Sequence, residues 1–597
     1  MAETNSEAAS PAITKFLTPS LAALLGITSG VLYFLTLARD VYLEDSGELI
    51  AAAYNLGIAH PSGYPLYLLL GKAFTWLPFG TVAFRLNLMS AVFAVGTAVL
   101  LFLSLLKLAR ILGKAGWSVS IVAFLVTLLF AVGRDFWSQA IIAEVYTLHT
   151  FLVGLLTWGF LAWWEGRKLR QVYWLAFLSG LGLTNHELFA FVLPVLWFII
   201  LMKAGEARSA KRIFVIAGLF LLGLSIYLYL PWRAAANPVV NFGQIHTFTD
   251  TVGHVLRVAY DDLNPGFANR WGHWNGFFAS FTNNYSWAMV ILAVGGAISL
   301  FRRRMEFLSV FGGGMILTIA LIIFLRRAAY GYTTEFPYRV YYFSAYYYLF
   351  CLAFVFLIET PKAAKFFAPL LLVYVAVLGF ENFQKVDLHE NPVATYYEEK
   401  LLSFPRDAVY LFVSEGYDGD SELFVLLYLQ KVKGLRPDVT ILDDNGIFYL
   451  PEDRVFLPQI VSLKAQRQDW LRFAIQHYSR TRPLLASFPV EAYAEGLVSV
   501  PNGFALQIFP EGPLRQASPL ELMPPKLPEL PRGNWDRAFQ DFLAAQYYQQ
   551  ALYFQSRGAS DAATSALLSA IRFDNEVYAE DYQAFQKFRA SLTAKVD

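Results

Sequence analysis

Long apolar runs are the feature that most limits what this chain can fold into. A bilayer's hydrocarbon core is about 30 Å thick and takes about 20 helical residues to cross. Every backbone N–H and C=O group inside it must be paired within the protein, so spanning runs are expected to be helices. The sequence predicts a polytopic α-helical membrane protein with about eleven spans, near 19–38, 83–106, 117–133, 147–164, 172–185, 187–202, 212–230, 284–301, 306–325, 341–358 and 364–380.

Composition agrees with this class. Of the 597 residues, 56% are hydrophobic and 16% are charged, whereas charged residues make up about 25% of ordinary soluble domains. The net charge of +1 argues against nucleic acid as a partner, because that partner requires a strongly basic face. The single cysteine, Cys351, excludes an intrachain disulfide. Residues 1–20 lack the pattern of a signal peptide, so the first run is expected to be a retained span.

The charges of the short connecting loops predict the orientation. One set of loops is rich in lysine and arginine, and such loops face the cytoplasm. The N-terminus is then inside, and everything after about residue 381 is outside. The basic residues of this set are Lys107, Arg110 and Lys114, then Arg167, Lys168 and Arg170, then Lys203, Arg208, Lys211 and Arg212, then Arg302, Arg303 and Arg304, then Lys362 and Lys365.

Nearly all polar groups suited to chemistry fall on the other, outer set of loops. Because the orientation was assigned from the cytoplasmic loops, this clustering is a largely independent observation. A transporter more often places ionisable groups near the bilayer midplane. The outer set contains Glu44, Asp45, Glu48, His60, Arg134, Asp135, Glu144, Asn185, His186, Glu187, Arg233, His246, His254, Arg257, Arg326, Arg327, Glu335 and Arg339.

The first outer loop, Leu43-Glu44-Asp45-Ser46-Gly47-Glu48, holds the densest group of acids. Acidic residues at the mouth of a span are costly unless they are paired or functional. In one interpretation Asp45 or Ser46 caps a helix running from Gly47 to Leu56, with Glu48 as the capping-box partner. In the other, Asp45 acts as a general base on an acceptor hydroxyl. Glu44 and Glu48 can supply the same chemistry, and Glu48 fits a structural role better. Such a cluster on an outer loop suggests sugar transfer from a lipid-linked donor.

Four further residues are candidate substrate contacts. The segment His60-Pro61-Ser62-Gly63-Tyr64-Pro65 is expected to be a rigid turn, in which His60 and Tyr64 bind either the loop itself or a substrate. Glu144 is expected inside an otherwise apolar helix, where a charge needs a partner such as His149, Arg134 or His186. His186 lies at the outer junction of two spans and can serve a sugar hydroxyl or a phosphate oxygen.

Arginines near the outer face are candidates for binding a donor phosphate, because the planar guanidinium suits that group. Arg233 follows Leu228-Tyr229-Leu230-Pro231-Trp232, and its alternative role is that of an interfacial arginine beside Trp232. Arg326, Arg327 and Arg339 compete for the phosphate. The sequence has no metal-ligand set of diagnostic spacing, so no metal is predicted, and adjacent acids such as Glu44 and Asp45 are too common to indicate one.

Composition changes after Phe380. We expect a transmembrane catalytic domain over 1–380, an outer α/β domain over 381–510, a proline-rich linker over 511–533 and a helical hairpin over 534–597. Strands are predicted at 408–413, 438–442, 483–489 and within 496–510, with a helix at 423–430, and the βαβ order favours a parallel pair. The hairpin resembles a single tetratricopeptide-like repeat or is an ordinary hairpin, and we expect it to pack on the α/β domain.

Several motifs resemble a known family. They are Asp45-Ser46-Gly47-Glu48-Leu49-Ile50-Ala51-Ala52-Ala53-Tyr54, Leu56-Gly57-Ile58-Ala59-His60-Pro61-Ser62-Gly63-Tyr64-Pro65-Leu66-Tyr67, Ala143-Glu144-Val145-Tyr146-Thr147-Leu148-His149, Gly182-Leu183-Thr184-Asn185-His186, Leu228-Tyr229-Leu230-Pro231-Trp232-Arg233-Ala234 with Asn237-Pro238, and Tyr428-Leu429-Gln430 with Gly434-Leu435-Arg436-Pro437-Asp438-Val439-Thr440. Together they resemble a bacterial family of formerly unknown function, related to the vertebrate transmembrane protein 260 type of protein O-mannosyltransferase that acts on plexin-type receptors.

The resemblance implies a GT-C fold, in which the first outer loop carries a catalytic acid and the donor is a polyprenyl- or dolichyl-phosphate sugar. On that pattern Asp45 is the base, and an outer-face arginine holds the donor phosphate. Glu187 departs from the pattern, which has a second histidine after His186. The length fits a bacterial member, with the active site and the C-terminal domain on the extracytoplasmic face of the inner (plasma) membrane.

The resulting functional prediction is an inverting glycosyltransferase that moves mannose from a polyprenyl-phosphate donor to Ser or Thr hydroxyls of exported proteins. The mannose assignment depends on the resemblance alone. Candidate donor- or substrate-binding residues are Glu44, Glu48, His60, Tyr64, Glu144, His186, Arg233 and Arg339. The alternatives are transfer to a glycan or lipid acceptor, a lipid-linked saccharide transporter and a non-catalytic scaffold. The sequence does not indicate an oligomeric state.

Overall fold

The computed structural model describes residues 11–242, 245–258, 272–325, 339–412, 421–443, 464–487, 490, 495–502, 505–510, 547–548, 551, 554 and 560–573. Its contacts divide the chain into two compact units. The helical unit comprises residues 1–40, 52–241 and 245–390, and the α/β unit comprises residues 41–51, 242–244 and 391–597. The short segment 41–51 is therefore assigned by its contacts to the α/β unit, although it follows the first helix of the chain.

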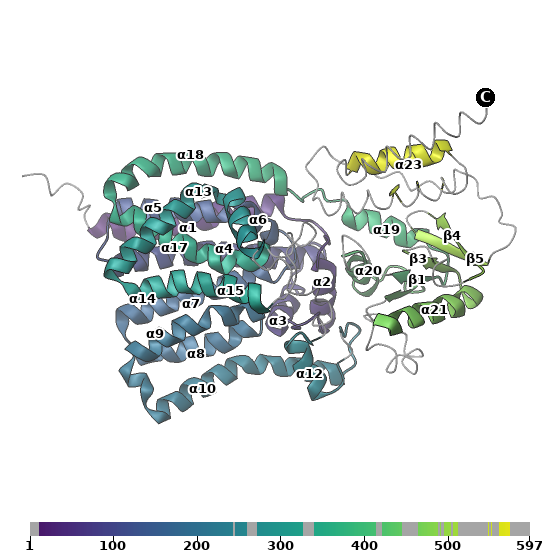
Figure 1. Cartoon of the computed structure of the whole chain (residues 1–597), viewed down its shortest axis with the longest axis horizontal. Helices are drawn as coiled ribbons and strands as arrows, with labels where there is room; N and C mark the ends of the chain where they lie inside the picture. Colours follow the sequence, from purple (N-terminus) through teal and green to yellow (C-terminus); the bar gives the residue numbers. More distant parts are fainter. Residues whose placement is uncertain are drawn as a thin grey trace, which may run out of the picture. The chain divides into compact units, whose positions relative to one another are not determined.

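The helical unit is a bundle in which the long helices run side by side (Figure 1). Its helices within the described residues are α1 Pro11–Thr36, α3 Pro65–Phe74, α4 Val82–Ile111, α5 Trp117–Ala131, α6 Arg134–Ala140, α7 Tyr146–Gly166, α8 Leu169–Leu183, α9 Leu193–Lys203, α10 Ala210–Leu224, α11 Tyr229–Ala235, α12 Phe248–Val255, α13 Gly272–Arg303, α14 Met305–Leu308, α15 Gly314–Leu325, α17 Phe343–Glu359 and α18 Pro361–Val386. Helix α2, Ser46–Asn55, begins in segment 41–51 and continues into this unit.

Seven helices among the described residues are long and apolar enough to cross a membrane, and the bent pair α5 and α6 would make eight. This establishes a polytopic helical membrane protein, whereas the predicted count of eleven spans stays a prediction. Three predicted spans, 172–185, 187–202 and 306–325, contain shorter helices. Helix α8 has 15 residues, α9 has 11 and follows a 3₁₀ turn at Glu187–Phe191, and Met305–Ala320 is a shorter apolar helix.

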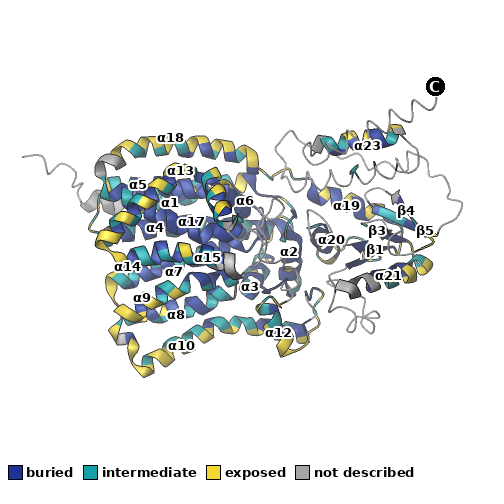
Figure 2. Ribbon diagram, in the orientation of Figure 1, coloured by how far each residue is buried: buried dark blue, intermediate teal, exposed yellow. Residues whose placement is uncertain are grey.

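Burial separates central helices from peripheral ones. In the apolar window of Val340–Glu359, which contains α17, 94% of the residues are buried, against 17% in the windows of α1, α18 and the span Ala210–Ala235. Figure 2 shows α17 dark along its length and exposed faces on α10 and α18. The exposed residues on those two helices include Phe214, Leu222 and Phe380, as expected for faces turned toward lipid tails.

Helices α8 and α10 approach each other through glycines. A Cβ atom on Gly180 would overlap the carbonyl oxygen of Phe220, and one on Gly223 would overlap that of Phe177. Small residues at such crossings let two backbones come close, which is how helices gain packing energy within a membrane. Any larger residue at either position would force the pair apart.

The α/β unit contains a five-stranded sheet with the order β2-β1-β3-β5-β4. Strand β1 pairs in parallel with β2 and with β3, and β5 pairs antiparallel with β3 and β4. The predicted strands and parallel pair are confirmed. The elements are β1 Val409–Phe412, β2 Thr440–Asp443, β3 Leu484–Ala486, β4 Leu497–Asn502 and β5 Ala505–Pro510, with α19 Val393–Ser403, α20 Ser421–Lys431, α21 Lys464–Thr481 and α23 Ser560–Phe573.

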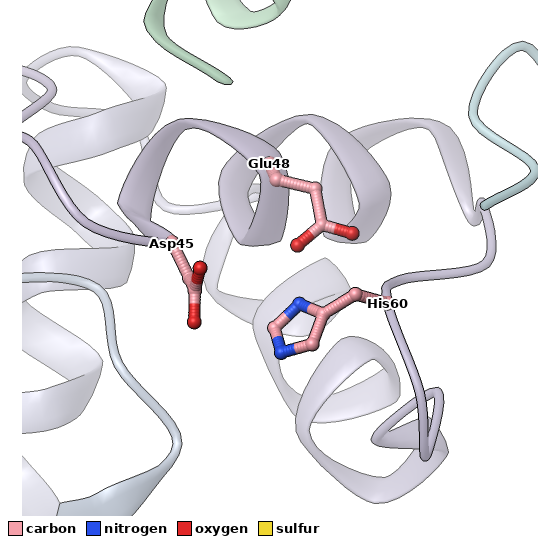
Figure 3. Close-up of side chains that lie close together, drawn as sticks. All are labelled: Asp45, Glu48 and His60. Atoms are coloured by element: carbon pink, nitrogen blue, oxygen red, sulfur yellow. The ribbon is translucent and has the colours of Figure 1, made fainter. Parts of the chain in front are cut away.

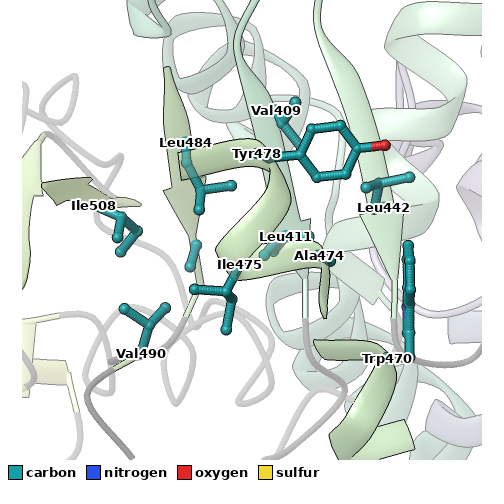
Figure 4. Packing of buried hydrophobic residues seen from close by; sticks show 11 residues of the cluster. Val409, Leu411, Leu442, Trp470, Ala474, Ile475, Tyr478, Leu484, Val490 and Ile508 are labelled. Atoms are coloured by element: carbon teal, nitrogen blue, oxygen red, sulfur yellow. The ribbon is translucent and has the colours of Figure 1, made fainter. Parts of the chain in front are cut away.

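Two apolar clusters stabilise this unit. In the first, Trp470 and Ile475 of α21 pack on Leu411, Leu442 and neighbouring sheet residues (Figure 4). In the second, Ala563 and Leu567 of α23 pack with Val500 of β4. The expectation that the C-terminal helices pack on the α/β unit is therefore confirmed for α23. The linker 511–533 lies outside the described residues, as does most of the predicted hairpin, so the tetratricopeptide-like interpretation stays a prediction.

Candidate active site

Asp45 lies directly before helix α2. The helix begins at Ser46, and the Leu49 amide donates to the Asp45 carbonyl oxygen at 2.9 Å. Asp45 thus has the position of an N-cap, one of its two predicted roles. Glu48 lies one turn further on, and residues three apart on a helix share a face. Its side chain is buried, whereas Asp45 is half-buried.

The predicted turn at His60 is confirmed. The Gly63 amide donates to the His60 carbonyl oxygen at 2.7 Å, and Gly63 has a φ of 87°, which glycine adopts easily. The Tyr64 hydroxyl lies 2.9 Å from Nε2 of His60 and 3.1 Å from the Pro61 carbonyl oxygen. When the hydroxyl donates to that carbonyl, it accepts from His60 Nε2–H. The turn thereby fixes the orientation of the imidazole.

Asp45, Glu48 and His60 converge within this one continuous segment of chain. Their possible ligand atoms all lie within 4.8 Å of one another. Figure 3 shows the two carboxylates and the imidazole pointing into a common space. Two carboxylates and an imidazole can share protons among themselves, or they can hold a divalent cation, for which carboxylate oxygens are usual ligands. The cluster therefore suits proton transfer, and the same three residues could hold a divalent cation.

A second group lies in the helical unit and centres on an ion pair. Arg257 Nη1 lies 2.9 Å from a carboxylate oxygen of Glu187 and 3.4 Å from the Tyr64 hydroxyl oxygen. Ser62 Oγ donates to the other Glu187 oxygen at 3.4 Å. Arg257 has a φ of 61°, which is uncommon for a residue with a side chain. Backbone strain of this kind clusters at functional sites.

His186 is buried beside this pair. Its Nδ1 lies 3.1 Å from a Glu187 oxygen and 3.2 Å from the Leu188 amide nitrogen. Its ring packs at 5.5 Å from that of Tyr64 and at 5.6 Å from that of Tyr146. Because the side chain has no exposed surface, the structure favours a role in positioning Tyr64 and Glu187 over direct contact with a sugar.

His254 supports the His60 turn from α12. Its Nε2–H donates to the Ala59 carbonyl oxygen at 2.9 Å. Burial lowers the pKa of His254 to about 4, the bond to Ala59 acts in the opposite direction, and His60 and Arg257 nearby lower it further. The ring is therefore neutral at physiological pH and acts as a hydrogen-bond donor to the backbone.

Three predicted site residues have other partners. Arg233 donates to the carbonyl oxygens of Leu56 at 2.5 Å and Asn55 at 3.5 Å, so it caps the C-terminal end of α2. Arg339 pairs with Asp135 at 3.3 Å, in a network with Ser280 and Asn284. Glu44 has a backbone amide that donates to Ser421 Oγ at 3.1 Å.

The prediction for Glu144 was wrong in one respect, because this residue lies between α6 and α7 and not inside a helix. Ser90 Oγ lies 3.3 Å from both the amide nitrogen and the carbonyl oxygen of Glu144. This hydroxyl pairs with the N–H and C=O groups of Glu144, which hydrogen bonds within a helix would otherwise pair. The side chain is buried, at 1% exposure.

The structure thus brings together Asp45, Glu48, His60 and Tyr64, with His186 packed on Tyr64. Arg257 and Glu187 belong to the outer set of polar residues but were not predicted as site residues. A signal was present: an acid at position 187, where the family pattern has a histidine, needs a cation if it is partly buried. Arg326 and Arg327 lie outside the described residues.

Comparison with known proteins gives the relationships of the chain. Residues 45–210 match the family model described as Protein O-mannosyl-transferase TMEM260 N-terminal domain. The mouse (Mus musculus) Protein O-mannosyl-transferase TMEM260 is 28% identical over 463 residues, which are 72% of this chain and 63% of the relative. The Dictyostelium discoideum protein of the same name is 27% identical over 272 residues, which are 42% of this chain and 32% of the relative. The chain thus spans less than two thirds of each relative's length.

Two solved structures show weaker likenesses. ArnT from Cupriavidus metallidurans bound to undecaprenyl phosphate has a TM-score of 0.48 and 11% identity, over 82% of this chain and 98% of that chain. The S. cerevisiae protein O-mannosyltransferase Pmt1–Pmt2 complex bound to the sugar donor has a TM-score of 0.29 and 21% identity, over 37% of this chain and 33% of that chain. These scores do not by themselves establish a fold. By sequence the chain is similar to the TMEM260-type protein O-mannosyltransferases, and its residues 45–210 match the model of their N-terminal domain.

Proposed function

We propose that this membrane protein is an inverting glycosyltransferase of the GT-C class. It transfers a sugar, for which we propose mannose, from a polyprenyl-phosphate donor to Ser or Thr hydroxyls of exported proteins. One observation carries the proposal. The family match begins at Asp45 and includes the whole segment in which Asp45, Glu48 and His60 converge. The names of the mouse and Dictyostelium relatives support the choice of mannose and of a protein acceptor.

The chemistry needs one base and one centre of positive charge. In the proposed reaction the acceptor hydroxyl oxygen forms a bond to the anomeric carbon as the bond from that carbon to the phosphate oxygen breaks. Asp45 takes the hydroxyl proton, and the polyprenyl phosphate leaves with the bonding electron pair. Attack opposite the leaving group inverts the anomeric centre. A lipid phosphate is a good leaving group, so general-base catalysis and a cation for the leaving phosphate suffice.

Arg257 is our choice for the residue that binds the donor phosphate. Its side chain is 17% exposed, and its guanidinium contacts Glu187 and the Tyr64 hydroxyl beside the His60 turn. A planar guanidinium suits a phosphate group in such a position. Arg233, by contrast, directs its guanidinium at backbone carbonyl groups. We assign Tyr64, His186 and Glu187 to orienting Arg257 and His60.

We further propose that the reaction takes place on the extracytoplasmic face of a bacterial plasma membrane. The distribution of lysine and arginine among the loops supports this orientation. A polyprenyl-linked donor in the membrane and an exported protein outside it would then meet on the same face.

The test is transfer by the purified protein in lipid nanodiscs, with polyprenyl-phosphate mannose and Ser/Thr-containing peptides from exported proteins. Wild type is compared with Asp45→Asn and with Glu390→Gln, a matched removal of an exposed carboxylate. General-base catalysis contributes about 10²- to 10⁴-fold, so we expect Asp45→Asn to lose that much activity while donor binding is retained. Glu390→Gln should transfer like wild type.

Other outcomes redirect or reject the proposal. Equal transfer by Asp45→Asn and wild type would show that Asp45 is not the base, and would leave Glu44, Glu48 and Glu144 to be tested. Transfer to a glycan or lipid but to no peptide would keep the enzyme class and change the acceptor. Donor binding followed by release on the other side of sealed vesicles, without transfer, would indicate a transporter.

A further inference from the structure

The backbone directly before Asp45 has an unusual conformation. Glu44 has a φ of 59°, in the left-handed region that residues with a side chain rarely adopt. Such a conformation costs about 1–3 kcal/mol and persists only where the surroundings hold it. It determines the direction in which the chain enters α2, and hence where the Asp45 carboxylate points. The contacts that hold Glu44 are therefore of interest for catalysis.

Two contacts with this part of the chain come from helix α20 of the α/β unit, to which segment 41–51 also belongs. The Glu44 amide donates to Oγ of Ser421, the first residue of α20, at 3.1 Å. The partner is separated from Glu44 by 377 positions in the sequence. This bond fixes the amide plane that leads into the left-handed residue.

Gly47 adds a second contact with the same helix. A Cβ atom at this position would overlap the carbonyl group of Phe424, and it would lie 2.8 Å from the Val425 amide nitrogen. The first turn of α2 therefore touches the backbone of α20 without an intervening side chain. Together Ser421 and Phe424 contact the chain on both sides of Asp45.

The first turn of α20 is itself anchored in the interior of the α/β unit. Glu422 is 3% exposed and accepts from Lys400 Nζ of α19 at 2.6 Å and from the Tyr410 hydroxyl of β1 at 2.5 Å. Removing one partner of a buried ion pair is strongly destabilising, so this pair opposes displacement of α20 from α19. The position of Ser421 is thus tied to α19 and to the sheet.

We propose that the first turn of α20 is a positioning element for Asp45, with Ser421 and Gly47 as positioning residues. The α/β unit then takes part in catalysis by holding the base, in addition to any part it has in binding an acceptor. This inference rests on the proposed function, because it assigns a purpose to the geometry around the base.

The kinetic test compares Ser421→Ala, Ser421→Thr and Gly47→Ala with wild type. Loss of one hydrogen bond is expected to lower kcat by about 3- to 10-fold, with the donor KM unchanged, because Ser421 acts on the base and not on the donor. Threonine keeps the hydroxyl and should restore kcat. Gly47→Ala should lower kcat more than Ser421→Ala does, since backbone atoms must move. Controls are Ser479→Ala, whose hydroxyl bonds within α21, and Gly218→Ala, which has open space in α10.

A spectroscopic test separates this inference from the proposed function. A spin label on Asp45→Cys, in a Cys351→Ser background, reports the mobility of the loop without any turnover. We expect Ser421→Ala to increase the mobility of the label and Ser479→Ala to leave it unchanged. Equal label mobility in the labelled parent, in Ser421→Ala and in Ser479→Ala would overturn the inference. So would a wild-type kcat in Ser421→Ala without the label. If wild type transfers no sugar, the proposed function fails and the mobility alone decides whether α20 holds the loop.

Discussion

At the scale of single residues, three arginines of the helical unit are distinguished by what their guanidinium groups already contact. Arg233 binds backbone carbonyl groups, Arg339 pairs with Asp135, and Arg257 pairs with Glu187 beside Tyr64. We therefore expect Arg257→Gln to weaken donor binding by about 10-fold or more, since a hydrogen bond to a charged group is worth about 1.5–3 kcal/mol. The measurement is the Kd of an unreactive polyprenyl-phosphate sugar analogue, which excludes any effect on turnover.

Arg233→Gln is the matched comparison. It removes the same charge from the same unit, but from a residue that caps the end of α2. We expect a lower thermal midpoint with an unchanged donor Kd. If Arg233→Gln weakens donor binding as much as Arg257→Gln does, the assignment of the phosphate site to Arg257 is wrong.

His254 gives the protein a dependence of stability on pH. Its pKa is about 4 in the folded protein, through burial above all, against about 6.5 in an unfolded chain. The unfolded state therefore binds more protons between these values, so the stabilisation is fully present above pH 6.5 and is lost as pH falls toward 4. From pH 7.5 to pH 5 the loss amounts to about 2 kcal/mol.

A glutamine at this position tests that expectation. His254→Gln keeps a donor for the Ala59 carbonyl oxygen but does not titrate. We expect the thermal midpoint of the variant to fall less than that of wild type between pH 7.5 and pH 5. Parallel curves for the two proteins would show that His254 does not contribute to the acid sensitivity.

At the scale of elements, local sequence patterns predicted strands and helices better than they predicted contacts between distant parts of the chain. The strands at β1 and β2 were visible as short apolar runs bounded by turn residues, and their parallel pairing followed from the helix between them. Glu144 was misplaced in a helix, whereas its backbone pairs with the Ser90 hydroxyl of α4, a contact that no local sequence pattern indicates. The pair of Arg257 and Glu187 joins positions 70 residues apart, and no spacing rule for helices or strands reaches that far.

The ion pair between α19 and α20 allows a prediction at this scale. Lys400→Met leaves the Glu422 carboxylate buried without its cation, and breaking a buried pair in this way costs about 3–5 kcal/mol. Lys400→Met combined with Glu422→Gln removes both charges, and the amide oxygen still accepts from the Tyr410 hydroxyl. We expect the double variant to recover most of the lost unfolding free energy, as measured by chemical denaturation of the full chain in detergent. A double variant no more stable than Lys400→Met would show that the charges are not the source of the cost.

At the scale of the whole molecule, the number of membrane crossings and the orientation constrain each other. An N-terminus inside and a C-terminus outside require an odd number of crossings. Of the seven long apolar helices, Leu17–Thr36 and Val82–Ile111 precede Ala115, and five follow it. If the bent pair α5 and α6 is one more span, six spans follow Ala115 instead of five. The two faces on which Ala115 and a C-terminal residue lie therefore distinguish odd counts from even ones.

Cysteine labelling measures those faces. In a Cys351→Ser background, we place a single cysteine at the exposed Ala115, in the loop after α4, or at the exposed Ser565 of α23. A membrane-impermeant maleimide should label Ser565→Cys in intact cells and Ala115→Cys only after the membrane is opened, because basic loops stay in the cytoplasm. Labelling of both in intact cells would indicate an even number of crossings between them. The reverse pattern would place the α/β unit in the cytoplasm, where the proposed exported acceptor is not presented.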